Sequence, residues 1–396
     1  MRNIRFISSS EFCSGCGACL VACPKDCISM NEGNLNKPII DEKKCIKCKL
    51  CLKVCPGAEY MTDSAIEKKI EENTSLGDVN RCTTCYSNDL QIRNNAASGG
   101  FITTITSQLL NQKLVDGVIC VQQNCNNPIN NKVIIAKKQT EIFNAAASRY
   151  SPASVCIPLK ELLKERGKYV FIGKPCDING LKKLQNVFPV LEENISLSIG
   201  LFCHHTPSRA ALKHILTSNK IPIENVSSIK FRGGGWPGNF EIKSSDQVEI
   251  NMTYFEAWNK FFSNIKYIPT RCLICRDSTA EQADFSVGDP WGKEFQQDKL
   301  GNSVVLIRNK RADEIYHRLI EDKYIISKNI SIEDVIRYQE NLLGKKRTSK
   351  LWRKALDIQN NKMVGLISLI NDTNSFKYKL SILKKVLLLY QKVGQT

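Results

Sequence analysis

Short apolar runs alternate with helix-like segments through the middle of the chain. The strand-like runs cover residues 115–121, 132–136, 169–172, 197–202 and 283–292, the last of which ends in a turn. Helix-like stretches cover residues 101–110 and 178–184 and begin again at Pro207. Because strands that alternate with helices form sheets with helices packed on their faces, the pattern predicts an α/β sheet that extends to about residue 320.

The two ends of the chain differ from this middle part. Two short apolar runs flank a polar turn within residues 28–40, which predicts a β-hairpin. Residues 67–80 are charged and poor in large apolar side chains, as in a linker. Residues 376–390 mix apolar residues with Lys in a helix-like pattern. Such a helix could lie on an anionic membrane face or a partner, or pack back onto the core, and the pattern leaves these alternatives open.

The composition is that of a globular protein with room for two or three domains. Of the 396 residues, 42% are hydrophobic and 24% are charged. No apolar signal segment follows Met1, and no apolar run reaches the ~18 residues of a membrane span. We therefore expect a cytoplasmic protein, membrane-associated only through its tail.

The net charge of +17 is concentrated near the C-terminus. Residues 341–396 hold twelve Lys and Arg but only two Asp and Glu, so the rest of the chain is mildly basic. Although a basic chain suits nucleic acid, the sequence carries no recognised nucleic-acid-binding motif. We expect no nucleic-acid partner.

Eighteen cysteines change the picture most. In a reducing cytoplasm thiols stay reduced, so closely spaced cysteines favour metal ligation over disulfides. The run Cys13-x2-Cys16-x2-Cys19-x3-Cys23-Pro24 returns 32 residues later as Cys45-x2-Cys48-x2-Cys51-x3-Cys55-Pro56. This is the spacing of bacterial ferredoxins that hold two [4Fe–4S] clusters.

In that motif the fourth cysteine of each run binds the other cluster. One cluster is therefore expected on Cys13, Cys16, Cys19 and Cys55, and the other on Cys45, Cys48, Cys51 and Cys23. Zinc sites are the less favoured alternative, because a zinc site closes with four ligands and needs no interleaved sets. Cys27 lies outside the motif and is expected to be a packing residue.

Four further cysteines are candidates for a third cluster. Cys176 and Cys203 each follow a predicted strand, and Cys272 and Cys275 form a CxxC pair. Because ligands gather at the carboxyl ends of parallel strands, the four thiols could meet there. Buried thiols and a structural CxxC explain the same spacing equally well.

The remaining cysteines give weaker signals. Cys82 and Cys85 form another CxxC, which fits a linker, a redox pair or extra ligands, and we favour the absence of metal there. Cys120, Cys125 and Cys156 stand singly and are expected to be packing residues.

Ser98-Gly99-Gly100 precedes a predicted helix. Such a segment brings backbone N–H groups to an anion at a helix N-terminus, as for a flavin pyrophosphate, although an ordinary capped helix fits as well. No Gly-x-Gly-x-x-Gly fingerprint and no P-loop are present, so nothing indicates a Rossmann NAD site or ATP. His204 and His205 could relay a proton near a flavin, but a structural histidine is the more common case.

Taken together, ordered motifs beyond the first 62 residues resemble the coenzyme F420 hydrogenase/dehydrogenase beta-subunit family. The motifs are Ser98-Gly99-Gly100, Val115-Asp116-Gly117, Lys174-Pro175-Cys176, Phe202-Cys203, Phe231-Arg232-Gly233, Arg271-Cys272-x2-Cys275 and residues 283–289.

The resemblance implies an α+β ferredoxin-like head with two [4Fe–4S] clusters, then an α/β flavin-binding domain and a short helical tail. The implied boundaries are a ferredoxin domain at 1–62, a linker at 63–81, the two halves of the family domain at 82–155 and 156–340, and a basic helical tail at 341–396.

The resemblance also implies cofactors and partners. A third [4Fe–4S] cluster is expected on Cys176, Cys203, Cys272 and Cys275, and FAD near Ser98, Gly99, Gly100 and Arg232. The expected activity is an oxidoreductase that exchanges hydride with coenzyme F420 or another carrier, alongside a redox protein partner or subunit. Two alternatives stay open: a flavin and iron–sulfur reductase linked to polysaccharide synthesis, and a flavin-free electron carrier.

Overall fold

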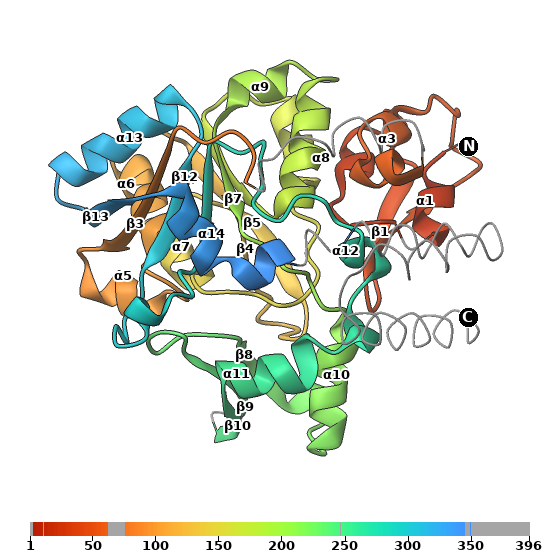
Figure 1. Cartoon of the computed structure of the whole chain (residues 1–396). Coiled ribbons are helices and arrows are strands. Elements are labelled where there is room, and N and C mark those ends of the chain that lie inside the picture. Colours follow the sequence, from red (N-terminus) through yellow and green to blue (C-terminus); the bar gives the residue numbers. More distant parts are fainter. Residues whose placement is uncertain (1–2, 11, 62–75, 246, 345–348, 350–396) are drawn as a thin grey trace, which may run out of the picture.

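The computed structural model describes residues 3–10, 12–61, 76–245, 247–344 and 349. A small N-terminal head lies against one side of a larger body, and a small three-stranded sheet lies below the body in the view of Figure 1. The predicted tail at 341–396 falls almost wholly outside the described residues, as do residues 63–75 of the predicted linker.

The head contains short elements held together by its cysteines. Its elements are α1 (Arg5–Ser9), α2 (Ala18–Val21), β1 (Ile28–Glu32), β2 (Asn36–Ile40), α3 (Leu50–Lys53) and the 3-10 helix η1 (Pro56–Met61). β1 and β2 pair antiparallel, which confirms the predicted hairpin. Ile4, Ile7 and Ile28 pack with the buried cysteines to form the core of the head.

The body is built on an eight-stranded mixed sheet in the order β13-β3-β12-β11-β7-β6-β4-β5. The strands are β3 (Arg81–Ser87), β4 (Gly117–Gln123), β5 (Asn131–Ala136), β6 (Tyr169–Gly173), β7 (Ile195–Leu201), β11 (Phe285–Gly288), β12 (Ser303–Ile307) and β13 (Ile325–Ile330). Parallel pairs join β4, β6, β7 and β11 in the centre, and antiparallel pairs complete both edges. The predicted α/β sheet is therefore confirmed.

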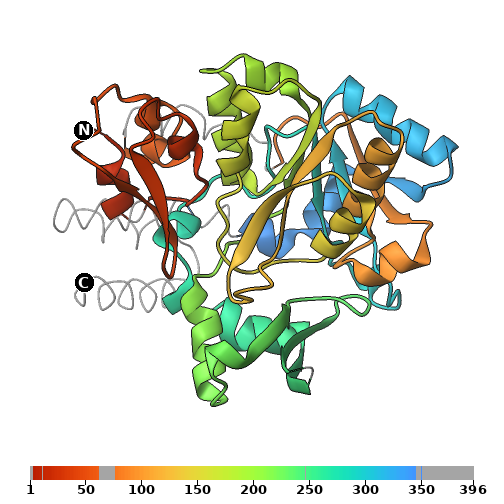
Figure 2. The ribbon, with the colours of Figure 1, turned by 180° about the vertical axis from the view of Figure 1, so that it is seen from behind.

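Helices cover both faces of this sheet. α6 (Phe101–Asn111), α7 (Gln139–Ala145) and α13 (Lys310–Glu321) share one apolar core with the sheet, whereas η2 (Ile157–Leu163), α8 (Pro175–Gln185) and α9 (Val190–Asn194) share another. The second core also includes Ala18, Val21 and Val54 of the head. The head is thus packed on the α8 side of the body, as Figure 2 shows from behind.

The small sheet was not predicted from the sequence. It consists of β8 (Val226–Lys230), β9 (Asn239–Ser244) and β10 (Gln247–Thr253), all antiparallel, with α10 (Arg209–Ser218) and α11 (Tyr254–Ala257) beside it. Its own apolar core contains Phe231, Phe240 and Phe262. The remaining described elements are α5 (Leu90–Asn95), α12 (Thr270–Leu273), α14 (Ile332–Tyr338) and the short helices η3 (Ile223–Asn225), η4 (Trp258–Phe262), η5 (Ile265–Tyr267) and η6 (Lys293–Phe295).

Two of the expected boundaries look different in the structure. Leu76, within the expected linker, is only 3% exposed and packs with apolar residues of the body, and β3 already begins at Arg81. The boundary at residue 155 divides one continuous sheet, because β4 lies before it and pairs with β6 after it. The two halves of the family domain form a single α/β unit.

Candidate functional site

The four thiols expected on the first cluster come together in the head. Cys55 belongs to the second cysteine run, yet its thiol interacts with those of Cys13 and Cys16 in the first. Burial, reinforced by these neighbours, raises the pKa of Cys55 to about 12. Cys19 lies within range of the same three thiols. Burial raises the pKa of Cys13, Cys19 and Cys55. Because metal binding removes thiol protons, three gathered thiols that resist ionisation in the protein alone fit a site completed by iron.

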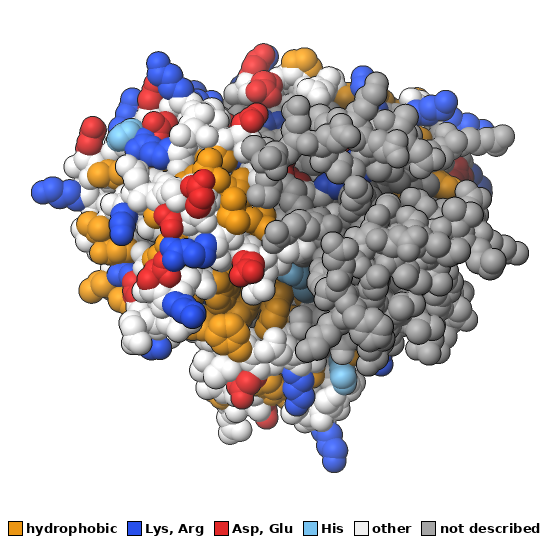
Figure 3. Space-filling model, in the orientation of Figure 1, with side chains coloured by type: hydrophobic (Ala, Val, Ile, Leu, Met, Phe, Trp, Pro, Cys, Tyr) orange, Lys and Arg blue, Asp and Glu red, His pale blue; other side chains and the backbone are white. Residues whose placement is uncertain are grey.

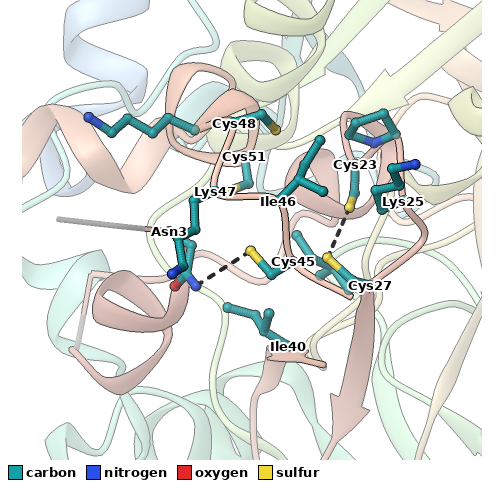
Figure 4. Close-up of a pocket in the computed structure, with 13 residues that line it drawn as sticks. Asn3, Cys23, Lys25, Cys27, Ile40, Cys45, Ile46, Lys47, Cys48 and Cys51 are labelled. Atoms are coloured by element: carbon teal, nitrogen blue, oxygen red, sulfur yellow. Dashed lines mark hydrogen bonds between the residues drawn. The ribbon is translucent and has the colours of Figure 1, made fainter. Parts of the chain in front are cut away.

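The thiols expected on the second cluster line a separate pocket of the head. Cys23, Cys45, Cys48 and Cys51 ring this pocket, as Figure 4 shows. Cys48 is exposed, whereas Cys23 and Cys51 are buried. Cys23 therefore lies with the second run, as the interleaved ligand sets require.

A fifth cysteine of this pocket, Cys27, packs in the core of the head as predicted and also contacts a candidate ligand. Cys27 is 6% exposed, and its Sγ lies 3.3 Å from that of Cys23. Burial and the hydrogen bond with Cys23 raise the pKa of Cys27 to about 12. Burial opposes ionisation of Cys23 too, but hydrogen bonds from Cys27 outweigh it and lower the pKa of Cys23. Cys27 therefore shares a hydrogen bond with a candidate cluster ligand in addition to its packing role.

Each cysteine run turns through two residues with left-handed backbone conformation. They are Gly15 and Gly17 in the first run, with φ of 70° and 87°, and Lys47 and Lys49 in the second, with φ of 57° and 65°. Turns of this kind point successive N–H groups at one concave spot, as anionic iron–sulfur sites require.

The third set of candidate ligands lies where the parallel strands end. Cys176 is in the first turn of α8, directly after β6, and Cys203 follows β7. Each of these thiols lies close enough to affect ionisation of the other groups there: Cys203 raises the pKa of Cys176, and both raise that of Lys174. The backbone N–H of Cys203 donates to the carbonyl of Ser278 at 2.9 Å, which brings the segment after Cys275 alongside.

Lys174 supplies positive charge at this spot. Burial alone would lower its pKa, but Asp177 and the two nearby thiols raise it above the ordinary value. Its ammonium donates to Asp177 Oδ2 at 2.6 Å. A buried cation beside four thiolates would stabilise the negative charge of a cluster.

The head and the third site are joined by close contacts. The backbone N–H of Cys156 donates to the carbonyl of Cys16 at 2.9 Å, and their thiols share a hydrogen bond that lowers the pKa of Cys16 to about 7. A Cβ on Gly180 of α8 would lie 3.2 Å from the sulfur of Cys156 and 3.4 Å from that of Cys16. Cys156 was expected to be a packing residue; it is fully buried, but at the junction between a cluster-ligand candidate and α8.

The hairpin of the head is fixed to the body as well. Arg209 is 1% exposed, and its guanidinium donates to the Gly33 carbonyl at 2.7 Å and to Asn36 Oδ1 at 2.8 Å. Asn36 in turn donates to Ser154 Oγ at 2.9 Å. These buried polar contacts hold the head at one distance from the third site.

Among the described residues, no three His, Cys, Asp or Glu side chains converge tightly enough to bind a single metal ion. In a [4Fe–4S] cube each thiolate binds a different iron, so its ligands stand farther apart than the four ligands of one zinc ion at about 2.3 Å.

Ser98, Gly99 and Gly100 lie near the carboxyl end of β3, on the side of the sheet where the third site follows the carboxyl ends of β6 and β7. β3 runs parallel to the central strands and ends at Ser87, whose N–H donates to the Gly99 carbonyl at 2.7 Å. A Cβ on Gly99 would lie 2.5 Å from the carbonyl oxygen of Cys85, and Gly100 has φ of 83° at the start of α6. The fold itself therefore requires both glycines. No side chain caps the N-terminus of α6, so no side chain accepts hydrogen bonds from the amides of its first turn.

Arg232 is buried rather than presented to a ligand. It is 1% exposed, and its guanidinium donates to both oxygens of Asp289, at 2.8 and 3.3 Å, and to the Pro237 carbonyl at 2.9 Å. Burial alone would lower its pKa, but Asp289 raises it. Asp289 also accepts from Trp236 Nε1 at 3.2 Å. Arg232 is thus a residue that positions the loop after β11.

Aromatic rings surround that loop. Trp291 stacks on Tyr254, with centroids 5.5 Å apart and planes at 17°, and lies 5.3 Å from Trp236. Phe255 beside them is 52% exposed. Figure 3 shows hydrophobic side chains gathered where the small sheet meets the body. Such a wall suits a planar ring system.

The other cysteines and the histidine singled out from the sequence lie outside the three thiol sets. Cys82 and Cys85 lie in β3 and pack into different apolar cores on opposite faces of the sheet, so they cannot meet as a redox pair. Cys120 is buried as predicted, whereas Cys125 is exposed and the packing prediction for it was wrong. His205 is 5% exposed, and its Nε2–H donates to the Phe262 carbonyl at 2.8 Å, a contact typical of a structural histidine.

No helix in the described part of the chain is long and apolar enough to cross a membrane.

Comparison with known families gives four matches. The N-terminal and C-terminal parts of the coenzyme F420 hydrogenase/dehydrogenase beta subunit match residues 82–160 and 166–333, and two 4Fe-4S dicluster domains match residues 12–58 and 37–88.

Relatives and a solved structure agree with these matches. The chain is 26% identical to the coenzyme F420-dependent sulfite reductase of Methanocaldococcus jannaschii, over 78% of this chain but only 46% of that protein. It is 24% identical to the F420-dependent formate dehydrogenase subunit beta of the same organism, over 64% of this chain and 63% of that subunit. The chain therefore spans about half to two thirds of these relatives.

A chain of the F420-reducing [NiFe] hydrogenase complex from Methanosarcina barkeri shares the fold, with a TM-score of 0.56 at 21% identity, over 72% of this chain and 96% of that one. The match of both family halves to one continuous sheet, behind a head with two ferredoxin cysteine runs, decides the classification. The protein belongs to the coenzyme F420 hydrogenase/dehydrogenase beta-subunit family of oxidoreductases and carries an N-terminal iron–sulfur module.

Proposed function

We propose that the chain transfers electrons between a one-electron redox protein and coenzyme F420, and that it does so with three [4Fe–4S] clusters and one FAD. Clusters move single electrons and a flavin exchanges either one electron or a hydride, so these cofactors together would supply the chemistry that joins the two partners. Family membership supports the acceptor, because several relatives are named for their dependence on F420.

One observation carries this proposal: the candidate ligands form a continuous series through the molecule. The series begins at exposed Cys48, crosses the head to Cys16, and continues past the Cys16–Cys156 contact to Cys176 at the start of α8. A flavin-free ferredoxin needs no third thiol set and no such junction. The series therefore favours an internal route over a simple carrier.

The proposed ligands are those expected from the sequence. Head clusters are assigned to Cys13, Cys16, Cys19 and Cys55, and to Cys45, Cys48, Cys51 and Cys23; the third is assigned to Cys176, Cys203, Cys272 and Cys275. Lys174 would offset the charge of the third cluster. Arg209 and Asn36 would keep the head at a fixed distance from it.

Two features near the carboxyl ends of the strands support the FAD assignment. The uncapped first turn of α6 provides N–H groups for a pyrophosphate, and the wall of Trp236, Trp291 and Tyr254 provides a surface for a ring system. In this proposal Ser98, Gly99 and Gly100 bring the α6 terminus to these strand ends, and Arg232 acts through Asp289 and Trp236 rather than by touching the flavin.

Cofactor content tests the proposal. The full chain, purified without oxygen, should contain about twelve iron atoms and about one FAD, because three four-iron clusters are expected. Iron is measured by colorimetric assay and flavin by release and fluorescence. About eight iron atoms without flavin would reduce the protein to a ferredoxin-type carrier.

A further inference from the structure

The two cysteine runs of the head differ at matched positions. Gly15 and Gly17 in the first run correspond to Lys47 and Lys49 in the second, 32 residues later. All four have left-handed backbone conformation. Glycine adopts this conformation without penalty, whereas a residue with a side chain pays a conformational cost. The second run therefore carries lysine at two places where the backbone favours glycine.

Contacts explain the glycines of the first run. A Cβ on Gly15 would lie 2.7 Å from the Asn36 carbonyl oxygen, and one on Gly17 would lie 2.8 Å from Cγ1 of Ile157 in the body. The first run is thus pressed against its own hairpin and the body. In the second run, by contrast, Lys47, Cys48 and Lys49 are all exposed.

Other left-handed lysines have a different explanation. Lys113, Lys220 and Lys323 each lie just beyond the end of a helix, where a left-handed residue terminates the helix. Lys47 and Lys49 instead flank the exposed cysteine of the second run.

These lysines stand in a cationic field around the pocket. Residues 43–54 contain five Lys and no Asp or Glu, and exposed Lys25 lines the same pocket. Neither Lys47 nor Lys49 forms an ion pair with an acidic side chain of the described residues. Nearby acids pair with other cations: Asp26 pairs with Lys160 and Glu42 with Arg5, whereas Asp41 pairs with Lys44 of this segment.

Charge balance for the cluster does not explain the lysines. A cluster on the first run would carry the same charge, yet that run has glycine at both matched positions. An apolar side chain adds to the surface, because Ile46 is 56% exposed between Cys45 and Lys47. An apolar centre with a charged rim is the usual composition of a protein docking site.

We propose that Lys25, Ile46, Lys47 and Lys49 form the docking surface for an acidic one-electron carrier protein, which exchanges electrons at the cluster of the second run. This inference rests on the proposed function and names its partner. One electron passes between the carrier and the cluster, and no bond or proton changes place. Lysines at this rim attract the acidic partner over roughly 8–10 Å of screened distance and set its orientation.

The test is the double variant Lys47→Gly/Lys49→Gly in the full chain loaded with its clusters. Glycine suits both backbone positions, so the variant is expected to fold as well as the parent. Reduced acidic plant-type [2Fe–2S] ferredoxin serves as the protein probe, and a viologen with one sulfonate group, which is neutral in its reduced form, serves as the small probe. Stopped-flow bleaching of the cluster absorbance gives both rate constants.

At low salt the rate constant with ferredoxin should fall about ten-fold and lose most of its salt dependence, while that with the viologen should stay unchanged. The matched control Lys113→Gly/Lys323→Gly removes the same charge from left-handed positions on the body and should leave both rate constants unchanged. An unchanged ferredoxin rate, or an equal fall with both probes, would overturn the docking surface.

The readout needs neither FAD nor coenzyme F420. A chain that fails to exchange with F420 would contradict the proposed function and leave the docking result standing. If the chain exchanges with F420 but the double variant keeps the parent's rate constant with ferredoxin, only the docking surface is contradicted.

Discussion

Cys203→Ser should lower the iron content from about twelve to about eight atoms per chain and should reduce F420-dependent electron transfer at least a hundred-fold, because the third cluster of four irons is lost. Serine keeps the size of the side chain but removes the thiolate. The two head clusters draw no ligand from this position, so dithionite should still bleach them. Iron analysis and the visible spectrum of the anaerobic protein measure both effects.

Cys125→Ser is the matched control, since Cys125 is exposed and belongs to none of the three thiol sets. It should keep all its iron and its rate. A Cys203→Ser protein that retained about twelve iron atoms would show that Cys203 is no ligand. Loss of every cluster together would instead contradict the independence of the head.

Arg232→Met should destabilise the protein by about 3–5 kcal/mol, the cost of leaving a buried charge without its partner. The Arg232 guanidinium is nearly inaccessible and binds both oxygens of Asp289. Because Asp289 also holds Trp236, the aromatic wall should loosen and flavin content should fall with stability. Urea unfolding and FAD content are the measurements.

Two variants complete this experiment. Arg232→Met combined with Asp289→Asn removes the unpaired charge and should recover part of the lost stability. Arg337→Met removes an exposed arginine that pairs with Glu294 and Asp334, and should cost far less stability than Arg232→Met. Equal losses for Arg232→Met and Arg337→Met would mean that burial of the Arg232 pair is unimportant.

Local sequence patterns predicted the features that depend on a few neighbouring residues. The two cysteine runs contain all the proposed ligands of the head, and their spacing also predicted that Cys23 and Cys55 exchange sites. The strand and helix alternation predicted most of the body. These features follow from short-range geometry, which is repeated in the sequence itself.

Features that depend on distant parts of the chain were missed or misjudged. Cys156 stands outside any motif, and only the fold brings it to Cys16. The reason for Gly99 is the carbonyl of Cys85 in a neighbouring strand. Arg232 looked available for a ligand because its partner, Asp289, lies 57 residues away.

The small sheet was missed for a similar reason. Exposed polar residues occupy much of β10, so only its pairing with β9 makes it a strand. Its placement at the carboxyl ends of the central strands then determines where the aromatic wall lies.

Reaction with reduced coenzyme F420 tests the central claim most directly. The anaerobic, oxidised full chain is mixed with reduced F420, and the visible absorbance of its clusters is followed together with the return of the F420 band. The account predicts that the clusters bleach as oxidised F420 appears, in a ratio of two electrons per F420. Clusters that dithionite reduces but that F420 leaves oxidised would contradict it.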